Sequence, residues 1–301
     1  MRSFRDWIGI ASKGFAMGAA DLVPGVSGGT VAFITGIYDE LISTIAGLGL
    51  QTLKDVFTEG VKVVWSKYNL SFLLVLGIGL FCAVAVLAGS IHWLQMEYPT
   101  ELRAFFFGLV LASAPILSRE INTTRVRKYL QILLGVTIAV IITSLPPSVQ
   151  SDSPLFLGIA GSIAICAMLL PGISGSFILL ILGAYTPVIS ALSNLDFVRI
   201  GAFALGAGIG LLSFSRVLSR ILKNHRSTAI AMLTGFLLGS LHVLWPWKRQ
   251  IEMLYTHSDG REEWLLGNIF PNFEPLSIIV IIAFIGVGAI VVTALDRFSR
   301  T

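Results

Sequence analysis

Hydrophobic stretches long enough to cross a lipid bilayer recur along the whole chain. A membrane-spanning helix needs about 20 mostly apolar residues, and the pattern predicts six ordinary spans, at about 71–94, 102–118, 128–145, 198–222, 228–246 and 275–295. Two further apolar segments, about 8–49 and 154–193, are interrupted by proline, glycine and serine. The arm before each interruption has only about 16 residues. This favours re-entrant hairpins, which enter the membrane and leave by the same side, over the alternative of two short full spans.

The two interrupted segments are copies of each other. Residues 14–43 align without a gap with residues 161–190, and twelve of the thirty aligned positions are identical. Their centres read PGVSGG at 24–29 and PGISGS at 171–176, and we call these the first and second glycine loops. Interrupted apolar segments at corresponding places in two halves of a chain point to the binding site of a transporter.

The basic residues predict how the chain is threaded through the membrane. With the N-terminus in the cytoplasm, sixteen of the 21 lysines and arginines fall on the cytoplasmic side, as the positive-inside rule requires. The five on the outer side are Arg103, Arg199, Lys248, Arg249 and Arg261. Each half then holds one hairpin and three spans, and an odd number of spans inverts the second half relative to the first.

We therefore predict an all-α polytopic membrane protein with both termini in the cytoplasm. One membrane domain covers residues 1–301 and is built as an inverted repeat of residues 1–147 and 148–301. Each half comprises one re-entrant helical hairpin and three transmembrane helices.

A second, weaker sequence similarity between the two halves follows each hairpin. GLVLAS at 108–113 resembles GFLLGS at 235–240 with a shorter offset, so the first half carries about 20 additional residues. The amphipathic stretch 50–69 accounts for them, and we expect it to lie as a helix on the cytoplasmic membrane surface.

Composition excludes a soluble protein. The chain is 55% hydrophobic and 13% charged, with a mean hydropathy of +0.84, which leaves too little charge to cover a soluble surface. The net charge of +4 does not indicate nucleic-acid binding, because the basic residues follow the predicted topology. Cys82 and Cys166 lie inside apolar stretches, so neither a disulfide nor a metal site is expected. The segment 247–274 is too short to bury a core of its own.

The glycine loops predict an anion site. After each proline, Gly-x-Ser-Gly opens a new helix, whose first turn leaves backbone N–H groups unpaired and carries partial positive charge. Such a helix N-terminus binds phosphate or carboxylate groups. The candidate substrate contacts are Ser27, Gly28, Gly29 and Thr30 in the first half, and Ser174, Gly175 and Ser176 in the second. The alternative is that glycine and serine merely allow tight helix packing.

Three charged residues complete the candidate site. Asp21 lies within the apolar segment, where its counterpart is Met168, and an intramembrane carboxylate indicates a proton or cation role. Its alternative is to cap a local N–H group. Glu40 is a second candidate for coupling or gating. Arg103, near the outer end of a span, is placed to meet an anionic headgroup, with an interfacial anchor as the alternative.

The sequence contains no catalytic constellation, metal-ligand cluster or nucleotide fingerprint. We expect a protein that is not an enzyme, has no catalytic or metal-binding residues and uses no cofactor. Any energy for transport then comes from an ion or membrane gradient, and the sequence leaves open whether transport is coupled to H⁺, to Na⁺ or to neither. The oligomeric state stays open, because the small residues Gly201, Gly206, Gly208 and Gly210 suit packing against a homo-oligomer partner as well as within the chain.

Several stretches resemble a known family. These are MGAADLVPGVSGGT at 17–30, GIYDE at 36–40, PGISGSFIL at 171–179, GSL at 239–241 and LWPW at 244–247. They are similar to the bacterial polyprenyl-phosphate translocases of the PopT type. The resemblance implies a multi-pass protein of the bacterial inner membrane that returns undecaprenyl phosphate from the outer to the cytoplasmic leaflet. The lipid is then reused for peptidoglycan and other surface polymers. Its partners would be this lipid and the surrounding membrane lipids.

Two other functions are compatible with this plan. Membrane undecaprenyl-diphosphate phosphatases also use paired hairpins with Pro-Gly-x-Ser sequences, but they carry an arginine in the serine motif, where this chain has Gly28 and Gly175. A carrier or channel for a small water-soluble anion is the second alternative.

Overall fold

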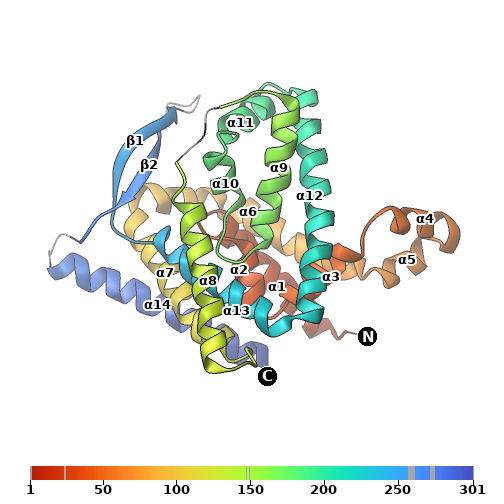
Figure 1. Cartoon of the computed structure of the whole chain (residues 1–301), viewed down its shortest axis with the longest axis horizontal. Helices are drawn as coiled ribbons and strands as arrows, with labels where there is room; N and C mark the ends of the chain where they lie inside the picture. Colours follow the sequence, from red (N-terminus) through yellow and green to blue (C-terminus); the bar gives the residue numbers. More distant parts are fainter. Residues whose placement is uncertain are drawn as a thin grey trace.

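The computed structural model describes residues 2–23, 25–146, 148, 150–256, 262–271 and 275–300. In these residues the chain forms helices joined by short loops, together with a two-stranded antiparallel sheet (Figure 1). Pro24 of the first glycine loop and Arg261 of the predicted outer side lie outside the described residues.

The first half of the chain contains eight described helices. They are α1 (Phe4–Asp21), α2 (Gly28–Ile34), α3 (Tyr38–Gly47), α4 (Leu50–Glu59), α5 (Val61–Lys67), α6 (Leu70–Glu97), α7 (Pro99–Ser118) and α8 (Arg125–Thr143). The second half begins with α9 (Pro154–Leu169), α10 (Gly175–Ile181), α11 (Tyr185–Ser193), α12 (Phe197–Asn224) and α13 (Arg226–Gly239). It ends with the 3₁₀ turn η1 (Ser240–His242), strands β1 (Lys248–Thr256) and β2 (Glu262–Asn268), and α14 (Pro275–Arg300).

Five described helices are long and apolar enough to span a membrane. They are α6, α7, α8, α12 and the part Leu276–Arg297 of α14, which confirms five of the six predicted ordinary spans. The sixth prediction, 228–246, is wrong in length. Helix α13 has 14 residues, about 21 Å at 1.5 Å per residue, against a hydrocarbon core of about 30 Å. The chain turns through η1 instead, and Pro246, which lacks an N–H group, could not have continued the helix.

The glycine loops have the same backbone conformation in both halves. Gly25 and Gly172 adopt left-handed φ values of 84° and 86°, and Gly36 and Gly183 adopt 73° and 69°. Residues other than glycine rarely adopt such values. Each loop therefore reverses the chain, so that α2 returns along α1 and α10 returns along α9 (Figure 1). The chain then bends again, by 107° between α10 and α11.

Glycines also set the closest helix contacts, at equivalent positions in the two halves. Helix α1 packs on α6 and α9 on α12, while α7 packs on α14 and α8 on α13. A β-carbon on Gly79 of α6 would lie 2.1 Å from the carbonyl oxygen of Ala11. One on Gly206 of α12 would lie 1.8 Å from the carbonyl oxygen of Gly158. Gly206 of α12 lies 127 positions after Gly79 of α6, and Gly158 lies 147 positions after Ala11. These are the two offsets of the repeat, so the same helix contact occurs twice.

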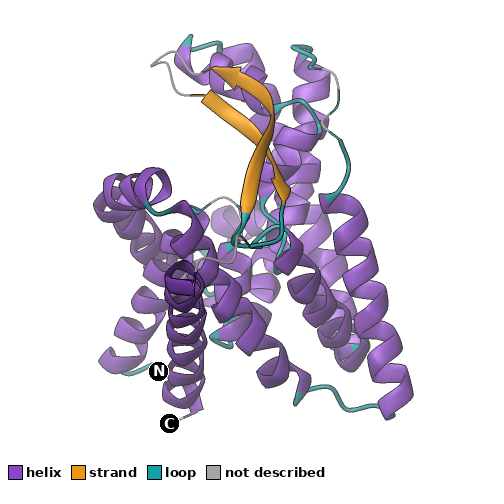
Figure 2. Ribbon diagram, turned by 90° about the vertical axis from the view of Figure 1, so that its left-hand side faces the viewer, coloured by secondary structure: helices purple, strands orange, loops and turns teal. Residues whose placement is uncertain are grey.

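The β1–β2 hairpin stands on one side of the helices, opposite the two chain termini (Figure 2). Its strands pair in an antiparallel register that places Lys248 opposite Asn268. The base is fixed to the preceding segment, because Trp245 Nε1 donates to the Ile269 carbonyl at 2.9 Å and the Ile269 N–H donates to the Trp247 carbonyl at 3.1 Å. The sequence pattern predicts only a loop here, so the hairpin is an addition to the all-α expectation.

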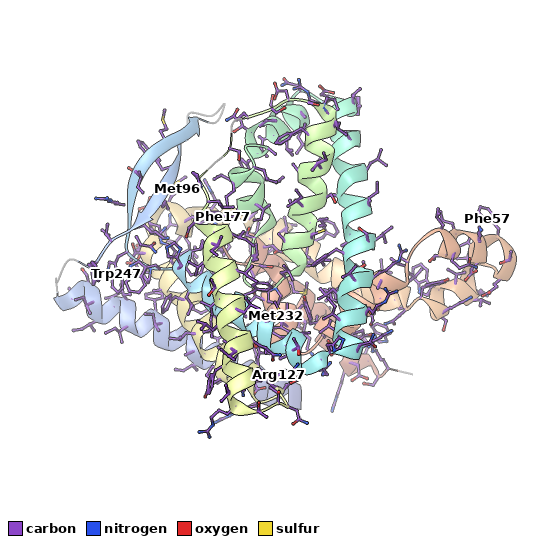
Figure 3. The ribbon with its side chains drawn as sticks, in the orientation of Figure 1. Phe57, Met96, Arg127, Phe177, Met232 and Trp247 are labelled. Carbon is purple, nitrogen blue, oxygen red and sulfur yellow. The ribbon has the colours of Figure 1, made fainter. Side chains whose placement is uncertain are left out.

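The amphipathic stretch 50–69 forms a pair of helices, α4 and α5, that projects from the rest of the protein (Figure 1). Gly60, at φ 86°, breaks the single helix that the pattern predicts. The Asp55 carboxylate, only 4% exposed, receives a 2.7 Å hydrogen bond from Lys67 Nζ and ties the two helices together. Phe57 and Leu50 are 88% and 79% exposed, and Phe57 lies at the tip (Figure 3). Contact of this surface with the membrane stays a prediction.

Candidate functional site

At the first glycine loop, the N-terminus of α2 is occupied by a carboxylate of the chain itself. The Gly28 N–H donates to Asp21 Oδ1 at 2.6 Å, and a β-carbon on Gly28 would lie 2.5 Å from Asp21 Oδ2. Only glycine leaves room for this contact. A carboxylate at this position complements the positive end of the helix, which corresponds to the capping alternative for Asp21.

Two hydroxyl groups, one in the first loop and one just after it in α2, hold this loop against the second half of the protein. Ser27 Oγ accepts from the Gly29 N–H at 3.1 Å and donates to the Met168 carbonyl at 3.3 Å. Thr30 Oγ1 accepts from the Gly172 N–H of the second loop at 2.8 Å. Ser27 and Thr30 are each 1% exposed. Their side chains therefore join the two glycine loops at the centre of the fold, in the conformation described.

The N-terminus of α10 at the second glycine loop is more open. Ser174 Oγ lies 2.9 Å from Ser176 Oγ and makes no capping bond to an α10 amide. Ser176 is exposed and Gly175 is half-buried. A β-carbon on Gly175 would approach no atom closer than the Ala164 carbonyl oxygen, at 3.1 Å. The two loops thus share a backbone conformation and differ in what occupies the following helix N-terminus.

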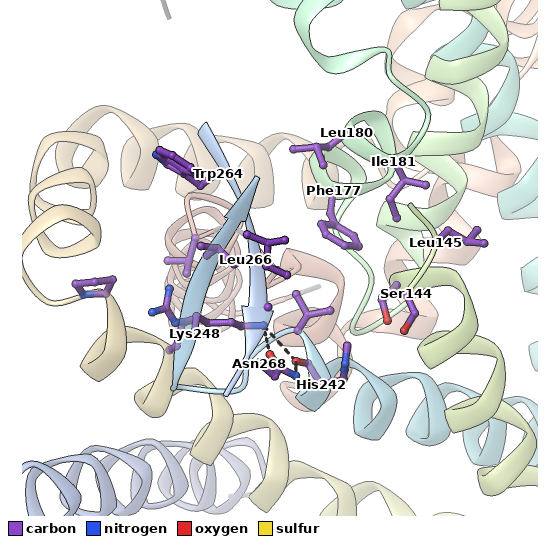
Figure 4. A pocket seen from close by; sticks show the side chains of 18 of the residues that line it. Ser144, Leu145, Phe177, Leu180, Ile181, His242, Lys248, Trp264, Leu266 and Asn268 are labelled. Carbon is purple, nitrogen blue, oxygen red and sulfur yellow. Dashed lines mark hydrogen bonds between the residues drawn. The ribbon is translucent and has the colours of Figure 1, made fainter. Parts of the chain in front are cut away.

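A cavity of about 580 Å³ is lined by the hairpin, η1, α10 and the adjoining ends of α6, α7 and α8 (Figure 4). It reaches Gly25 of the first loop and Arg103 of α7. Its apolar lining includes Leu102, Phe177, Leu180, Ile181, Trp264 and Leu266. Of the eight predicted contacts, Arg103 lines the cavity, whereas the other seven, at the two glycine loops and the start of α2, are not among its lining residues.

One end of the cavity carries two cationic side chains and no carboxylate. Arg103 Nε donates to the Pro246 carbonyl at 3.2 Å, and Lys248 Nζ donates to Asn268 Oδ1 at 2.6 Å. The lining residues include no Asp or Glu, and within the described part of the chain neither cation makes a salt bridge. Burial, followed by the nearby Arg103 charge, lowers the pKa of Lys248 to about 8.

Lys248 was predicted from the sequence only as an outer cation and not as a site residue. Its position two residues after Pro246, directly after the Trp245–Trp247 segment, gave no direct signal. Only the hairpin, which folds β1 back over η1, brings Lys248 to the cavity lined by Arg103.

Glu40 lies away from the cavity, at the start of α3. It forms an ion pair with Arg2 and accepts from Asn69 Nδ2 at 2.7 Å. The neighbouring Asp39 forms an ion pair with Arg226, at the start of α13. These contacts connect the first hairpin to the chain start and to the second half. In the described residues, no three His, Cys, Asp or Glu side chains are grouped to hold a metal.

Long apolar helices, two matching broken hairpins and a cavity between them define a multi-pass membrane protein. Residues 17–262 match the VCA0040-like family, described as undecaprenyl phosphate translocase-like, and the chain belongs to this family.

Two curated relatives cover most of the chain. A polyprenyl-phosphate transporter of Vibrio cholerae is 42% identical over 266 residues, which is 88% of this chain and 86% of that protein. A polyprenyl-phosphate transporter of Staphylococcus aureus is 33% identical over 264 residues, 82% of this chain and 88% of that protein. No solved structure matches the chain.

Proposed function

We propose that this protein is a flippase that returns undecaprenyl phosphate from the outer to the cytoplasmic leaflet of the bacterial inner membrane, for reuse in cell-envelope polymer synthesis. Family membership and two relatives named as polyprenyl-phosphate transporters support this substrate class. The protein acts as a transporter without chemical conversion of the lipid.

The observation that carries the proposal is the chemistry of the cavity. Its end near Arg103 and Lys248 is cationic without a lining carboxylate, and its remaining wall is largely apolar. A half-buried charge is costly unless it is paired, so this end suits an anion. Undecaprenyl phosphate joins one anionic headgroup to an apolar chain. About 580 Å³ accommodates the headgroup and the first isoprene units, while the rest of the tail stays in lipid.

The packing supports an inverted repeat. Equivalent glycine contacts join α1 to α6 and α9 to α12, and α7 and α8 each pack against a helix of the other half. With the N-terminus in the cytoplasm, the hairpin and the cavity face outward, and the Asp39 and Glu40 ion pairs face the cytoplasm. Both termini lie on the side away from the hairpin (Figures 1 and 2). The conformation described is then open to the outer leaflet, as alternating access requires for loading.

The glycine loops form the next part of the headgroup path. Ser174, Gly175 and Ser176 offer an open helix N-terminus beside the cavity. Gly28, Gly29 and the hydroxyls of Ser27 and Thr30 become available when the loops separate and Asp21 leaves the Gly28 amide. Exchange of the Asp21 carboxylate for the headgroup phosphate at Gly28 links binding to the charge state of Asp21, and so to H⁺ or Na⁺.

An Asp21→Asn variant tests this link. Asparagine retains an oxygen that accepts from the Gly28 N–H but loses the negative charge. Binding of undecaprenyl phosphate should stay within about twofold, while the transport rate falls about tenfold, because the bond to Gly28 loses its charge-assisted part. Dependence on the pH or Na⁺ gradient should disappear. The control is Asp39→Asn, which removes a carboxylate of the α3 ion pairs. Gradient dependence that is unchanged in Asp21→Asn contradicts the coupling role.

Ligand selectivity tests the proposed function. Purified protein is titrated with undecaprenyl phosphate, undecaprenyl diphosphate, phosphatidylglycerol and inorganic phosphate. Selective binding of the lipid monophosphate is the expected result. Equal binding of all four anions would favour a small-anion carrier, and release of phosphate from the diphosphate would identify a phosphatase.

A further inference from the structure

We infer that Lys248 of the β1–β2 hairpin and Arg103 of α7 form a two-cation receptor that selects a phosphate monoester over a phosphodiester headgroup. The inference rests on the proposed function and deepens it, because it assigns headgroup selectivity to a hairpin outside the repeated helices.

Lys248 is held in place by its neighbours. It is the first residue of β1. Oδ1 of its register partner Asn268 accepts a hydrogen bond from the Lys248 ammonium at 2.6 Å. The His242 carbonyl accepts a second, longer bond at 3.4 Å. An ammonium group has three N–H donors, so the described acceptors use two and leave one for a ligand. Figure 4 shows the Lys248 side chain extending to Asn268 and His242 at the base of the hairpin.

Arg103 is anchored to the same segment of chain. Its Nε donates to the Pro246 carbonyl, two residues before Lys248. This bond uses one of the five N–H donors of a guanidinium, and within the described residues the terminal N–H groups have no hydrogen-bond acceptor. Trp245, on the other side of Pro246, is fixed by its bond to the Ile269 carbonyl. The hairpin base therefore positions both cations before a ligand arrives, which reduces the entropy cost of binding.

The charges of the site match a dianion. Arg103 and Lys248 repel each other, no carboxylate is among the lining residues, and the nearby charge that acts on Arg103 comes from Glu101, outside the lining. A phosphate monoester carries between one and two negative charges near neutral pH, since its second pKa is about 6. A phosphodiester, as in phosphatidylglycerol, carries one. Two cations therefore gain more from a monoester, and this distinguishes the carrier lipid from the bulk phospholipids around it.

The apolar wall fixes the direction of the tail. Leu266 and Trp264 of β2 line one side of the cavity, and Phe177 and Leu180 of α10 line the other (Figure 4). A headgroup bound at Lys248 and Arg103 places the first isoprene units between these two walls. The hairpin thus contacts both parts of the lipid.

A pair of neighbouring variants tests the receptor. Lys248→Gln removes the cation at the cavity, whereas Arg249→Gln removes one unit of charge from the next residue, which is exposed and does not line the cavity. Lys248→Gln should weaken binding of undecaprenyl phosphate about tenfold or more and change binding of phosphatidylglycerol far less. Arg249→Gln should bind both lipids as the wild type does, and Lys248→Arg should restore the affinity for the monophosphate.

The pH profile provides a measurement that needs no variant. A bound phosphate favours the ammonium form, so affinity for undecaprenyl phosphate should be highest below the pKa of Lys248, about 8, and fall as the pH rises through that value. Of the other groups here, Arg103 stays protonated, the Glu101 charge acts on Arg103, and burial followed by the Lys248 charge lowers the pKa of His242. Lys248→Arg should bind independently of pH between about 7 and 9.

The outcomes separate the inference from the proposed function. If the wild type binds undecaprenyl phosphate selectively and Lys248→Gln binds it equally well, the receptor is wrong and the transport function stands. A flat wild-type pH profile overturns the receptor in the same way, even if Lys248→Gln fails to fold. If the wild type does not prefer undecaprenyl phosphate to inorganic phosphate or phosphatidylglycerol, the proposed function itself fails.

Discussion

An Arg103→Gln variant is expected to lose selective binding of undecaprenyl phosphate, with the dissociation constant rising about a hundredfold. Arg103 is half-buried, lines the cavity and has no carboxylate partner in the described part of the chain. Glutamine keeps an amide donor but removes the charge and the Nε–H group that bonds to the Pro246 carbonyl. Because Lys248 is then the one cation at this end of the cavity, the loss should be larger for the monophosphate lipid than for phosphatidylglycerol.

The matched control is Arg199→Gln. Arg199 is also predicted to be an outer-side cation, but it is paired with Asp152 at 3.7 Å and with Asp196 at 3.4 Å. Exposed pairs of this kind contribute little, so this variant should bind within about twofold of the wild type. Titration of both purified variants with the lipid monophosphate measures the difference. Equal losses in the two variants would show a general effect of charge, and no loss in Arg103→Gln would remove this residue from the site.

A Gly206→Ala variant is expected to destabilise the fold, while Gly208→Ala on the same helix is not. The added methyl group at 206 would lie 1.8 Å from the Gly158 carbonyl oxygen, so α12 must move away from α9. Forced separation of packed elements costs about 1–3 kcal/mol. At Gly208 a β-carbon would meet no atom within 4 Å. The glycines of α12 differ in this way because α9 covers only one of its faces.

The midpoint of thermal unfolding of the two purified variants in detergent tests this prediction. A lowered midpoint in Gly206→Ala, with Gly208→Ala like the wild type, is the expected result. Equal midpoints would mean that α9 and α12 do not pack at this glycine. The equivalent change Gly79→Ala, where the β-carbon would lie 2.1 Å from the Ala11 carbonyl oxygen, should destabilise α1 against α6 in the same manner.

The repeated elements could be predicted from the sequence because their signals are local. Apolar runs give the spans, and the Gly25/Gly172 and Gly36/Gly183 pairs lie at the same offset as the rest of the duplication. Each glycine supplies a backbone conformation that the fold needs at that point. The single interfacial helix predicted at 50–69 was a less complete description, because Gly60 allows a chain reversal that hydrophobic patterning does not reveal.

The cavity could not be predicted, because it depends on contacts between distant segments. Arg103 and Lys248 are 145 positions apart, and they meet only because α13 stops early and the hairpin folds back over η1. The sequence of the hairpin alternates only weakly between apolar and polar residues, and the pairing of its strands has two register irregularities. Local composition also could not show that Asp21 bonds to the Gly28 amide, since both capping and ion coupling suit a carboxylate at that position.

The two glycine loops are alike in backbone and unlike in surroundings, which gives the proposed cycle a direction. The first loop is closed by Asp21 and by the hydroxyls of Ser27 and Thr30, whereas Ser176 of the second loop is exposed. Met168 replaces Asp21 at the equivalent position of the repeat. If the two glycine loops are inverted and only the first has a carboxylate, the lipid headgroup would enter at the second loop and leave beside the first.

Leaflet transfer of labelled undecaprenyl phosphate in proteoliposomes of defined orientation is the most direct test of the transport function. A phosphatase added outside removes the headgroup label only from the exposed leaflet, so transported lipid becomes protected. We expect protection to increase with time when the hairpin faces outward, and to stay at the level of protein-free vesicles with Arg103→Gln. Equal protection with and without the protein would contradict transport, and wild-type rates in Arg103→Gln would contradict the cavity as its entry site.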